Sequence, residues 1–403
     1  MSDIDVAATP PVGGVDHHVS VAPAAAVPEP RAAADGGPDM VQLLTPEGER
    51  VPHAEYDEMV AALSNEDLRG LYRDLVLIRR FDLEATSLQR QGELGLWVSL
   101  LGQEAAQIGC GRALRPQDHA FPGYREHGIA WTRGIDPMRI IAMYRGVDKG
   151  AWNPDEHHFH GYTIVIGNQV LLGTGYAMGV QRDGAVGTDD PERDSAVVAF
   201  MGDGATAQGD VNEGFVFAGV YNSPIVFFCQ NNQWAISEPN ERQTRVPIYR
   251  RADGFGFPGV RVDGNDVLAV YAVTTQMLDR ARTGQGPSLI EAFTYRMAAH
   301  TTSDDPTKYR VSAEVEVWKL RDPVARYKRW LMSEGIADAA FFDSVGAQAD
   351  ELAAHVRTAT VTMADPDVDD MFDQVYVEPH RQVEDDKAAF HAYQDSFETA
   401  QGA

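Results

Sequence analysis

Residues 195–237, SAVVAFMGDGATAQGDVNEGFVFAGVYNSPIVFFCQNNQWAIS, form the stretch that decides the fold. The apolar run Ala196 to Phe200 lies between a charged segment and a Gly-rich turn, which predicts a buried strand. The segment from about 210 to 221 has acids in its first turn and apolar residues at helical spacing, and 225–229 predicts a second buried strand. Two strands joined by a helix run parallel, so the sequence predicts an α/β fold, a parallel sheet flanked by helices.

Polar residues follow both predicted strands. Asp203 lies in the turn after the first strand, with Gly204 and Ala205, and Asn232 follows the second strand. Open α/β sheets bind ligands at the carboxyl ends of their strands, so Asp203 and Asn232 are expected to face one crevice. Their oxygens suit Mg²⁺, and a helix N-terminus behind Gly204 and Ala205 would offer N–H groups to a phosphate. A GDG turn or an Asn pair alone is more often an ordinary loop, but together they predict a magnesium–phosphate site.

The composition narrows the class of protein. The 403 residues carry a net charge of −26, of which −6 lies in residues 1–50 and −13 in residues 331–403. Nucleic acid and membrane partners are therefore not expected. The acidic ends are interpreted as solvated surface, with docking to a basic partner as the alternative. The two cysteines form no CxxC motif, and there is neither a signal-peptide pattern nor an apolar run near the ~20 residues of a membrane span, so we expect a cytoplasmic location.

Three regions are expected along the chain. Residues 1–40 are rich in Ala and Pro and are predicted to form a disordered leader. Residues 41–330 carry the strand and helix patterns of the α/β domain. In this range Ser64 and Asp67 predict the capped start of a long amphipathic helix. Residues 331–403 are predicted to form an acidic, helical C-terminal region that wraps the sheet.

Two segments have alternative interpretations. DEHHFHG, residues 155–161, holds three histidines but lacks cysteine and helical HxxxH spacing, so a polar loop is favoured over a metal site. In the helix predicted after the apolar turn Ile164 to Ile166, Gly173, Gly175 and Gly179 differ by one residue from the dinucleotide-binding fingerprint. We interpret these glycines as small residues that permit close helix packing.

Two further loops end near the predicted crevice. PGYREHG, residues 122–128, places Tyr124 and Arg125 between glycines after a predicted strand, a setting that suits recognition of an oxyanion, although arginines are common in surface loops. His300 follows the last predicted core strand, residues 289–295. A lone histidine in a loop is usually incidental, but its position at the ligand edge of the sheet favours a functional role.

From about Glu55 to Leu331 the chain resembles the α subunits of the thiamine diphosphate-dependent 2-oxo acid dehydrogenases. These are the decarboxylating first components of the pyruvate and branched-chain complexes. The matching blocks, in order, are LGQEA, GYREHG, the GDG-to-NNQWAIS unit, RVDGNDV and TYRMAAHTTSDDPTKYR. The GDG turn followed by NN is similar to the signature of thiamine diphosphate enzymes, so the resemblance implies a thiamine diphosphate-binding fold of the diphosphate-binding type.

The resemblance implies roles for the residues after the two central strands. Asp203, the side chain of Asn232 and the backbone carbonyl of Trp234 would bind Mg²⁺. Gly204 and Ala205 would meet the diphosphate of the cofactor through backbone N–H groups.

The same resemblance implies that other loops complete the cofactor site. Tyr124, Arg125 and His300 would complete the anion pocket. Ile164 and Ile166 would hold the aminopyrimidine, with Ile166 as the apolar wedge that bends the cofactor. His300 would also lie near the reacting carbon and act in catalysis.

Partners follow from the resemblance as well. In this family a separate β subunit supplies the glutamate that activates the pyrimidine, and the sequence shows no second, pyrimidine-binding half. The chain is therefore expected to be inactive alone and to work as an α2β2 heterotetramer. The acyl group produced from a 2-oxo acid substrate would pass to a lipoyl-bearing acyltransferase component.

The substrate preference rests on fewer residues. TSDDPTKYR is more similar to the branched-chain members, and Leu96, Trp97 and Val98 are apolar where pyruvate enzymes carry a histidine at the position of Val98. An apolar wall suits an aliphatic side chain. We expect branched-chain 2-oxo acids, with pyruvate as the alternative. Gln230 departs from an arginine common in branched-chain relatives, and Thr301 occupies the position of a regulatory phosphoserine of animal relatives.

Three other functions remain open on the residues alone. A self-contained thiamine enzyme would need its own activating glutamate and a second α/β domain, for which the chain is short. A magnesium-dependent phosphate-ester enzyme could use Asp203 as a nucleophile. The third is a nonenzymatic nicotinamide- or nucleotide-binding module, which thiamine diphosphate binding with and without Mg²⁺ would distinguish.

Overall fold

The structure is a computed structural model that describes residues 37, 39–148 and 152–401, so the predicted leader up to residue 36 lies outside the described residues. Its centre is a six-stranded sheet in the order β1-β7-β8-β4-β3-β2, in which every pair of neighbours is parallel. The strands are β1 Met40–Val41, β2 His119–Phe121, β3 Val197–Gly202, β4 Ile225–Asn231, β7 Gly259–Asp263 and β8 Ser288–Phe293. The predicted parallel α/β sheet is confirmed.

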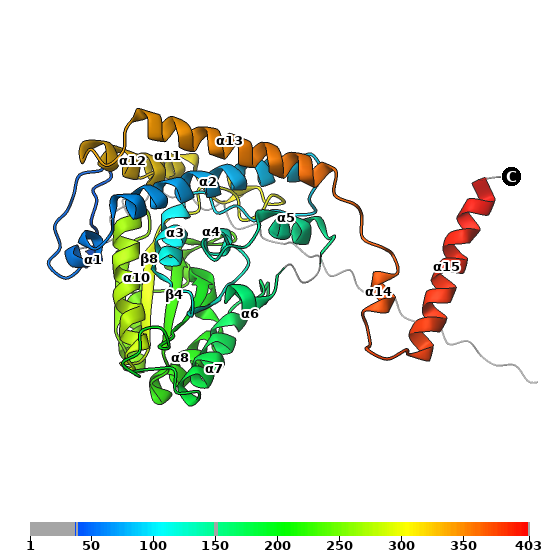
Figure 1. Cartoon of the computed structure of the whole chain (residues 1–403), viewed down its shortest axis with the longest axis horizontal. Coiled ribbons are helices and arrows are strands. Elements are labelled where there is room, and N and C mark those ends of the chain that lie inside the picture. Colours follow the sequence, from blue (N-terminus) through cyan, green and yellow to red (C-terminus); the bar gives the residue numbers. More distant parts are fainter. Residues whose placement is uncertain (1–36, 38, 149–151, 402–403) are drawn as a thin grey trace, which may run out of the picture.

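Alternate residues of the central strands enter two separate cores. Val198 and Phe200 of β3 join the larger core, while Val197 and Ala199 join the smaller one, because successive side chains of a strand point to opposite faces. Helices α3 (Glu104–Ala113) and α10 (Val267–Arg282) cover the first face, and α7 (Asn168–Arg182) and α8 (Gly209–Tyr221) cover the second. Figure 1 shows α10 beside β8 and β4, with α7 and α8 below. Both faces of the sheet are therefore buried, which explains the apolar runs of the central strands β3 and β4.

A second layer of helices lies beyond α3. It begins with α2 (Asn65–Arg90), whose start is the predicted capping box: Asp67 N–H donates to Ser64 Oγ at 3.2 Å, and Ser64 N–H donates to the Asp67 carboxylate at 2.9 Å. Helix α13 (Ala339–Val361) lies along α2 on the side away from the sheet, as Figure 1 shows. The prediction that the C-terminal helices wrap the sheet is therefore wrong for α13, because its apolar side chains pack on α2. One such contact joins the rings of Tyr72 and Phe342, 5.0 Å apart.

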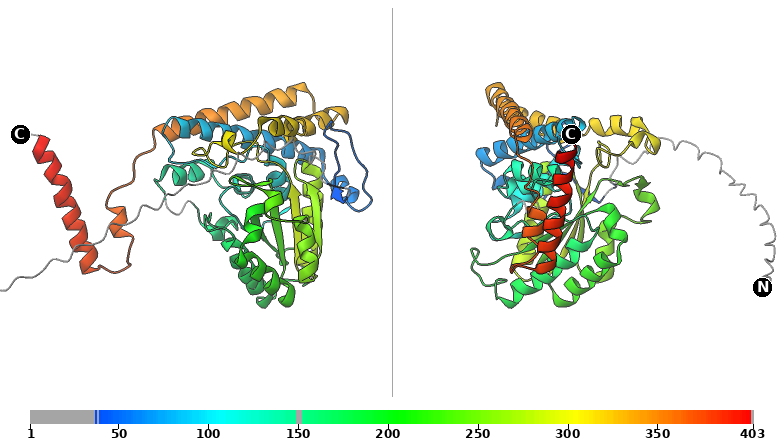
Figure 2. Two further views of the ribbon diagram at one scale, coloured as in Figure 1. Left: turned by 180° about the vertical axis from the view of Figure 1, so that it is seen from behind. Right: turned by 90° about the vertical axis from the view of Figure 1, so that its right-hand side faces the viewer.

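The last two helices stand apart from this body. Helices α14 (Asp370–Asp373) and α15 (Arg381–Gln401) form a hairpin that extends away from the sheet in Figures 1 and 2. Lys387 of α15 forms ion pairs with Asp369 at 2.9 Å and Asp373 at 2.8 Å, and these pairs connect the two helices. The acidic C-terminal region thus contains helix α13, which packs on α2, and a projecting hairpin. The domain boundary placed at residue 330 stays a prediction.

The remaining elements are short or peripheral. The α-helices are α1 Asp57–Ala61, α4 His127–Thr132, α5 Pro137–Arg145, α6 Pro154–His157, α9 Arg251–Phe255, α11 Ser312–Lys319 and α12 Pro323–Ser333. The 3₁₀ turns are η1 Asp203–Ala207, η2 Asn240–Arg242, η3 Ile248–Arg250 and η4 Pro306–Lys308, and β5 Trp234–Ala235 pairs with β6 Glu238–Pro239. Within the described ranges, no helix combines the length and the apolar character needed to cross a membrane.

The glycines of α7 differ in what they face. A Cβ on Gly173 would lie 3.2 Å from Ala199 Cβ of β3, so this glycine permits the close helix–sheet packing that was predicted. A Cβ on Gly175 or Gly179 would meet no atom of the described chain within 4 Å. For these two glycines the packing prediction is wrong within this chain, because they lie on the outer side of α7.

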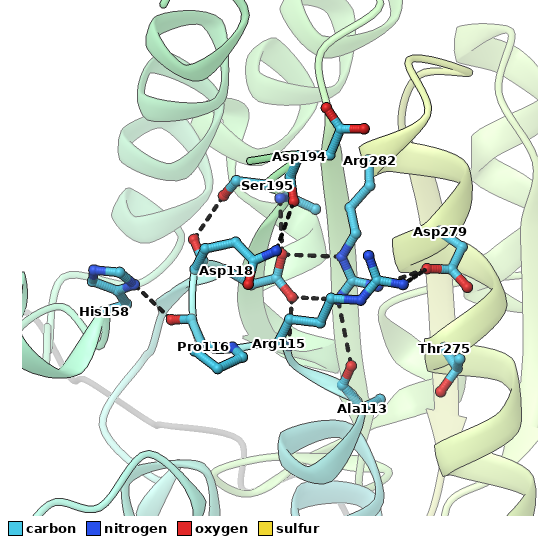
Figure 3. Close-up of polar contacts among 12 residues, drawn as sticks. Ala113, Arg115, Pro116, Asp118, His158, Asp194, Ser195, Thr275, Asp279 and Arg282 are labelled. Atoms are coloured by element: carbon cyan, nitrogen blue, oxygen red, sulfur yellow. Dashed lines mark hydrogen bonds and ion pairs between the residues drawn. The ribbon is translucent and has the colours of Figure 1, made fainter. Parts of the chain in front are cut away.

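A buried ion pair joins β2 to α10 (Figure 3). Asp118, directly before β2, accepts a hydrogen bond from Arg282 Nε at 3.1 Å and a second one from Arg282 Nη2. The same carboxylate accepts from the backbone N–H groups of Ala196 at 2.9 Å and Arg115 at 2.7 Å. Asp118 and Arg282 are both almost fully buried. The pair therefore fixes an edge strand of the sheet to the end of a core helix.

Candidate active site

A cleft of about 470 Å³ lies where β2, β3, β4 and β8 end. Every residue predicted for the site lines it except Trp97: Leu96, Val98, Tyr124, Arg125, Ile164, Ile166, Asp203, Gly204, Ala205, Asn232, Trp234 and His300. Segments separated by more than two hundred residues meet here because parallel strands place their carboxyl ends at one edge of the sheet.

The three predicted metal ligands come from two adjacent strand ends. Asp203 follows β3, is 1% exposed, and accepts from Gln243 Nε2 at 3.1 Å. Burial raises the pKa of Asp203 to about 6, while hydrogen bonds from its own backbone N–H and from Gln243 act in the opposite direction. Asn232 follows β4, and its Oδ1 accepts from Trp234 N–H at 3.2 Å. Carboxylate, amide and carbonyl oxygens are the ligand types that Mg²⁺ takes.

The other asparagine of the NN pair has a structural role. Asn231 donates from Nδ2 to Glu291 of β8 at 2.7 Å, and its Oδ1 accepts from Gln233 N–H and from Asn240 Nδ2. These contacts hold the turn in which Gln233 has the unusual φ of +69°. Asn231 therefore shapes the loop that carries Trp234, and Asn232 faces the cleft.

The backbone after β3 forms the predicted turn, followed by a helix close to the predicted start near residue 210. Helix α8 starts at Gly209, and the 3₁₀ turn η1 separates it from β3. Gly204 and Ala205 thus belong to a tight turn and not to the first turn of the helix. A Cβ on Gly204 would lie 2.6 Å from Ala235 Cβ, so only glycine allows the turn to approach β5 this closely.

Arg125 and His300 line one side of the cleft, and the guanidinium group of Arg296 lies buried behind His300. Arg125 donates to the carbonyl of His300 at 2.9 Å and contacts His300 Nδ1 at 3.3 Å. Arg296, which follows β8, contacts the same Nδ1 at 3.4 Å and donates to the Trp234 carbonyl at 3.2 Å. Sequence reasoning missed Arg296, although its position directly after a core strand was the signal that could have found it.

The surroundings of His300 determine its protonation. Burial, followed by the positive charges of Arg125 and Arg296, lowers the pKa of His300 to about 4, with Asp304 acting in the opposite direction. The ring is therefore neutral at pH 7. Guanidinium N–H groups can only donate, so Nδ1 accepts and the ring proton lies on Nε2. His300 can thus donate one hydrogen bond from Nε2.

The predicted apolar wall is divided between the cleft and the core. Leu96 and Val98 line the cleft. Trp97 is fully buried behind them, donates from Nε1 to Asp82 at 2.9 Å and stacks on His127. It therefore supports the wall without lining it, because neighbouring residues of an extended segment point in opposite directions.

Buried polar side chains form another part of the cleft, of which sequence reasoning had noted only Gln230. Gln103, Glu126, Gln169 and Gln230 all line it. Gln230 Nε2 donates to Glu126 at 2.5 Å, and burial raises the pKa of that carboxyl group. The glutamine found where an arginine was expected thus pairs with a buried acid beside the anion pocket. Gln103 lies in the LGQEA block, which was the available signal.

The histidines of residues 155–161 make ring and backbone contacts. His158 Nδ1 contacts the Pro116 carbonyl at 2.7 Å, and His160 stacks on Phe121. Among the described residues, no three His, Cys, Asp or Glu side chains are grouped so that they could hold a metal ion. These contacts agree with the preferred interpretation of a polar loop.

Comparison with known proteins identifies the family. A family model described as "Dehydrogenase E1 component" matches residues 72–363, which is well over half of the chain. The chain belongs to this family. The resemblance seen in the sequence is confirmed, and because E1 dehydrogenases depend on thiamine diphosphate, the predicted cofactor class is confirmed with it.

Curated relatives agree with this E1 assignment. The chain is 44% identical over 339 residues to the 3-methyl-2-oxobutanoate dehydrogenase subunit alpha of Mycobacterium tuberculosis (strain ATCC 25618 / H37Rv), covering 84% of this chain and 89% of the relative. It is 39% identical to the pyruvate dehydrogenase E1 component subunit alpha of Acholeplasma laidlawii, covering 69% and 79% of the two chains. It is 37% identical to the pyruvate dehydrogenase E1 component subunit alpha of Staphylococcus aureus (strain N315), covering 74% of this chain and 78% of that protein.

Proposed function

We propose that this E1 chain is the α subunit of a branched-chain 2-oxo acid dehydrogenase. With a β subunit it binds thiamine diphosphate and Mg²⁺, decarboxylates the substrate and transfers the acyl group to the lipoyl group of an acyltransferase component. The observation that carries this proposal is the meeting of Asp203, Asn232, Arg125 and His300 in one cleft of an E1-family chain. In the alternative, the chain has the same role in an enzyme whose substrate is pyruvate.

The residues of the cleft fit the cofactor and its metal. Asp203, Asn232 and the Trp234 carbonyl offer the oxygen ligands that Mg²⁺ requires. The buried Asp203 carboxylate has a neutral amide, that of Gln243, as its side-chain hydrogen-bond partner, so a bound cation would supply the opposite charge that a buried carboxylate needs. Gly204 and Ala205 line the cleft, and their backbone N–H groups would donate to the diphosphate.

When it is bound, thiamine diphosphate supplies the carbon that attacks the 2-oxo group and the ring that accepts the electrons released on decarboxylation. The residues of the chain itself bind and orient the cofactor and the substrate. Arg125 is held by the carbonyls of Ser99 and His300, so its positive charge is fixed beside the anion pocket. His300 donates from Nε2 to an oxygen of the reacting group, and Arg125 is the guanidinium group that lines the cleft beside it. Ile164 and Ile166 hold the aminopyrimidine against an apolar surface.

Apolar residues around the cleft support a partner chain. Ile164 and Ile166 are 78% and 42% exposed at the cleft. The outer face of α7 adds Leu172, beside the uncovered glycines of that helix. Large exposed apolar patches mark protein interfaces. We propose that the β subunit covers this side and supplies the activating glutamate, in an α2β2 heterotetramer with a cytoplasmic location.

Two observations favour branched-chain substrates. Leu96 and Val98 give the cleft an apolar wall, and the relative at 44% identity is named for 3-methyl-2-oxobutanoate. That substrate has two more carbon atoms than pyruvate. At about 0.8 kcal/mol for each buried methylene, the wall would favour it by roughly tenfold in kcat/KM.

Co-expression of the chain with a β subunit tests the proposal. We expect dye-coupled oxidation of 3-methyl-2-oxobutanoate that depends on thiamine diphosphate and Mg²⁺, at a kcat/KM about tenfold above that for pyruvate. The chain without a β subunit should be inactive. Full activity of the lone chain would favour a self-contained enzyme, and a preference for pyruvate would select the alternative substrate.

A further inference from the structure

The carboxamide of Asn232 must present its oxygen, and not its NH₂ group, to serve a cation. Amide oxygen and nitrogen have nearly the same shape, so the neighbouring hydrogen bonds decide which of them faces the site. Two such bonds are present. Trp234 N–H donates to Asn232 Oδ1 at 3.2 Å, and Asn232 Nδ2 donates to Gln103 Oε1 at 3.0 Å. The orientation of Asn232 is thus fixed from both ends.

Gln103 is itself rigidly placed. It is fully buried immediately before α3. Its backbone N–H donates to the Leu100 carbonyl at 2.8 Å, and its carbonyl accepts from Gln107 N–H at 3.2 Å. The side chain of Gln103 therefore extends to Asn232 from a backbone that is held at the start of a core helix.

The two amides form a directional chain. If Gln103 turned its NH₂ toward Asn232, then Asn232 would have to turn its own NH₂ toward the Trp234 N–H, and two donors would face each other. The backbone N–H of Trp234 therefore fixes both side chains. In the resulting orientation Gln103 Nε2 is buried and has no hydrogen-bond partner among the described residues. A buried donor without a partner costs about 1–3 kcal/mol.

We propose that Gln103 is a positioning residue for the metal site: its Oε1 holds the Asn232 oxygen toward the cation, and its Nε2 donates to an oxygen of the group that fills the cleft. The second part follows because Gln103 lines the cleft and its Nε2 has no acceptor within the described chain. This inference rests on the proposed function, since it takes Asn232 to be a metal ligand.

The test measures thiamine diphosphate binding by calorimetry on the co-expressed αβ enzyme, with and without Mg²⁺. The ratio of the two Kd values reports how strongly the metal assists binding. For Gln103→Leu, which removes both hydrogen bonds, we expect this ratio to fall about tenfold, the effect of one hydrogen bond. For Gln103→Glu the ratio should stay within about threefold, because the carboxylate still accepts from Asn232, while the Kd with Mg²⁺ rises about tenfold because the Nε2 donor is lost.

Gln117→Leu is the matched control. This half-buried glutamine lies before β2, away from the cleft, and its Nε2 donates to the carbonyls of Pro191 at 2.7 Å and Asp194 at 3.0 Å. Its Kd ratio should equal that of the wild type. Thermal melting checks that each variant is folded, and Gln103→Ser, too short to reach Asn232, replaces the leucine variant if that one does not fold.

Two results would count against different claims. A folded Gln103→Leu or Gln103→Ser enzyme that keeps the wild-type ratio overturns the positioning role alone. A wild-type enzyme that binds thiamine diphosphate equally well without any divalent metal contradicts the proposed function itself.

Discussion

His127 illustrates how the interior sets the protonation of single residues. Its ring stacks on Trp97 with centroids 4.5 Å apart, behind the apolar wall of the cleft. Nε2 lies 2.9 Å from the Val98 carbonyl and Nδ1 lies 2.9 Å from the Tyr162 hydroxyl. A carbonyl can only accept, so Nε2 carries the proton and Nδ1 accepts from the hydroxyl in the neutral ring. Burial lowers the pKa of His127 to about 3.

The low pKa of His127 predicts a loss of stability in acid. The unfolded chain takes up the proton near the ordinary pKa of about 6.5, but the folded chain does so only near 3, so the free energy of unfolding falls as the pH drops between these values. From pH 7 to pH 5 this residue should contribute a loss of about 2 kcal/mol. Urea unfolding of wild type and His127→Phe at both pH values measures the difference.

In that experiment the variant is expected to be less stable at both pH values, because Val98 and Tyr162 lose a partner, but less sensitive to acid. His355→Gln, an exposed change on α13, should retain the wild-type response. Equal responses in wild type and His127→Phe would contradict the assignment of a neutral, buried His127.

Asp203 carries the second prediction at this scale. Asp203→Asn keeps the size of the side chain but removes its charge, so we expect the fold to survive and the Mg²⁺-dependent part of thiamine diphosphate binding to be lost, by at least tenfold in Kd. Calorimetry with and without Mg²⁺ measures binding, and thermal melting reports the fold. Unchanged Mg²⁺ dependence would exclude Asp203 as a ligand.

At the scale of elements, β2 is short and lies at the edge of the sheet, so its position depends on contacts made outside the ladder. Arg282 at the end of α10 contacts two acids that differ in burial: Asp118 is fully buried, and the side chain of Asp279 is 48% exposed. Both are visible in Figure 3. Breaking a buried pair leaves an uncompensated charge, whereas an exposed pair is worth little.

The two acids predict different costs for the same substitution. Asp118→Ala should lower the free energy of unfolding by about 3–5 kcal/mol, because Arg282 stays buried and two backbone N–H groups lose their acceptor. Asp279→Ala, the matched control, should cost no more than about 1 kcal/mol. Denaturant unfolding of both variants measures the difference. Similar costs would show that burial does not decide the strength of this connection.

At the scale of the whole molecule, the sheet and its helices form one body from which the α14–α15 hairpin projects (Figure 2). The family match ends at residue 363, before this hairpin. Lys387 and His391 of α15 both contact Asp369, and the ring of Phe372 packs against that of Phe390. The hairpin is therefore stabilised by contacts between its own two helices.

Removal of the hairpin should therefore leave the body intact. A chain that ends at Ala364 is expected to melt within about 2 °C of the full-length chain, because the two cores remain complete, while its helical circular dichroism decreases. A matched truncation at Gly335 also removes α13 and should lower the Tm strongly, since α13 covers α2. A large drop for the first truncation would mean that the hairpin contributes to the body.

The sequence predicted much of the fold because its signals are local. The apolar runs of β3 and β4, the capping box at Ser64 and the turn at GDG each depend on a few neighbouring residues. The meeting of Asp203 and Asn232 in one cleft also followed, since parallel strands share one ligand edge. Arg296 and Gln103 were missed because their roles depend on side-chain contacts with distant residues, and Trp97 was assigned to the wall because its direction was unknown.

The sequence by itself determined the parallel α/β sheet, the E1 resemblance and the strand ends that carry the candidate site, because periodicity, turns and motif order are properties of short segments. Only the tertiary structure decided that Asn231 holds the turn through Glu291 and Asn240, that Gln103 accepts a hydrogen bond from Asn232, and that Gly175 and Gly179 lie uncovered on α7. These features depend on hydrogen-bond directions and packing between elements far apart in the chain, which no local pattern records.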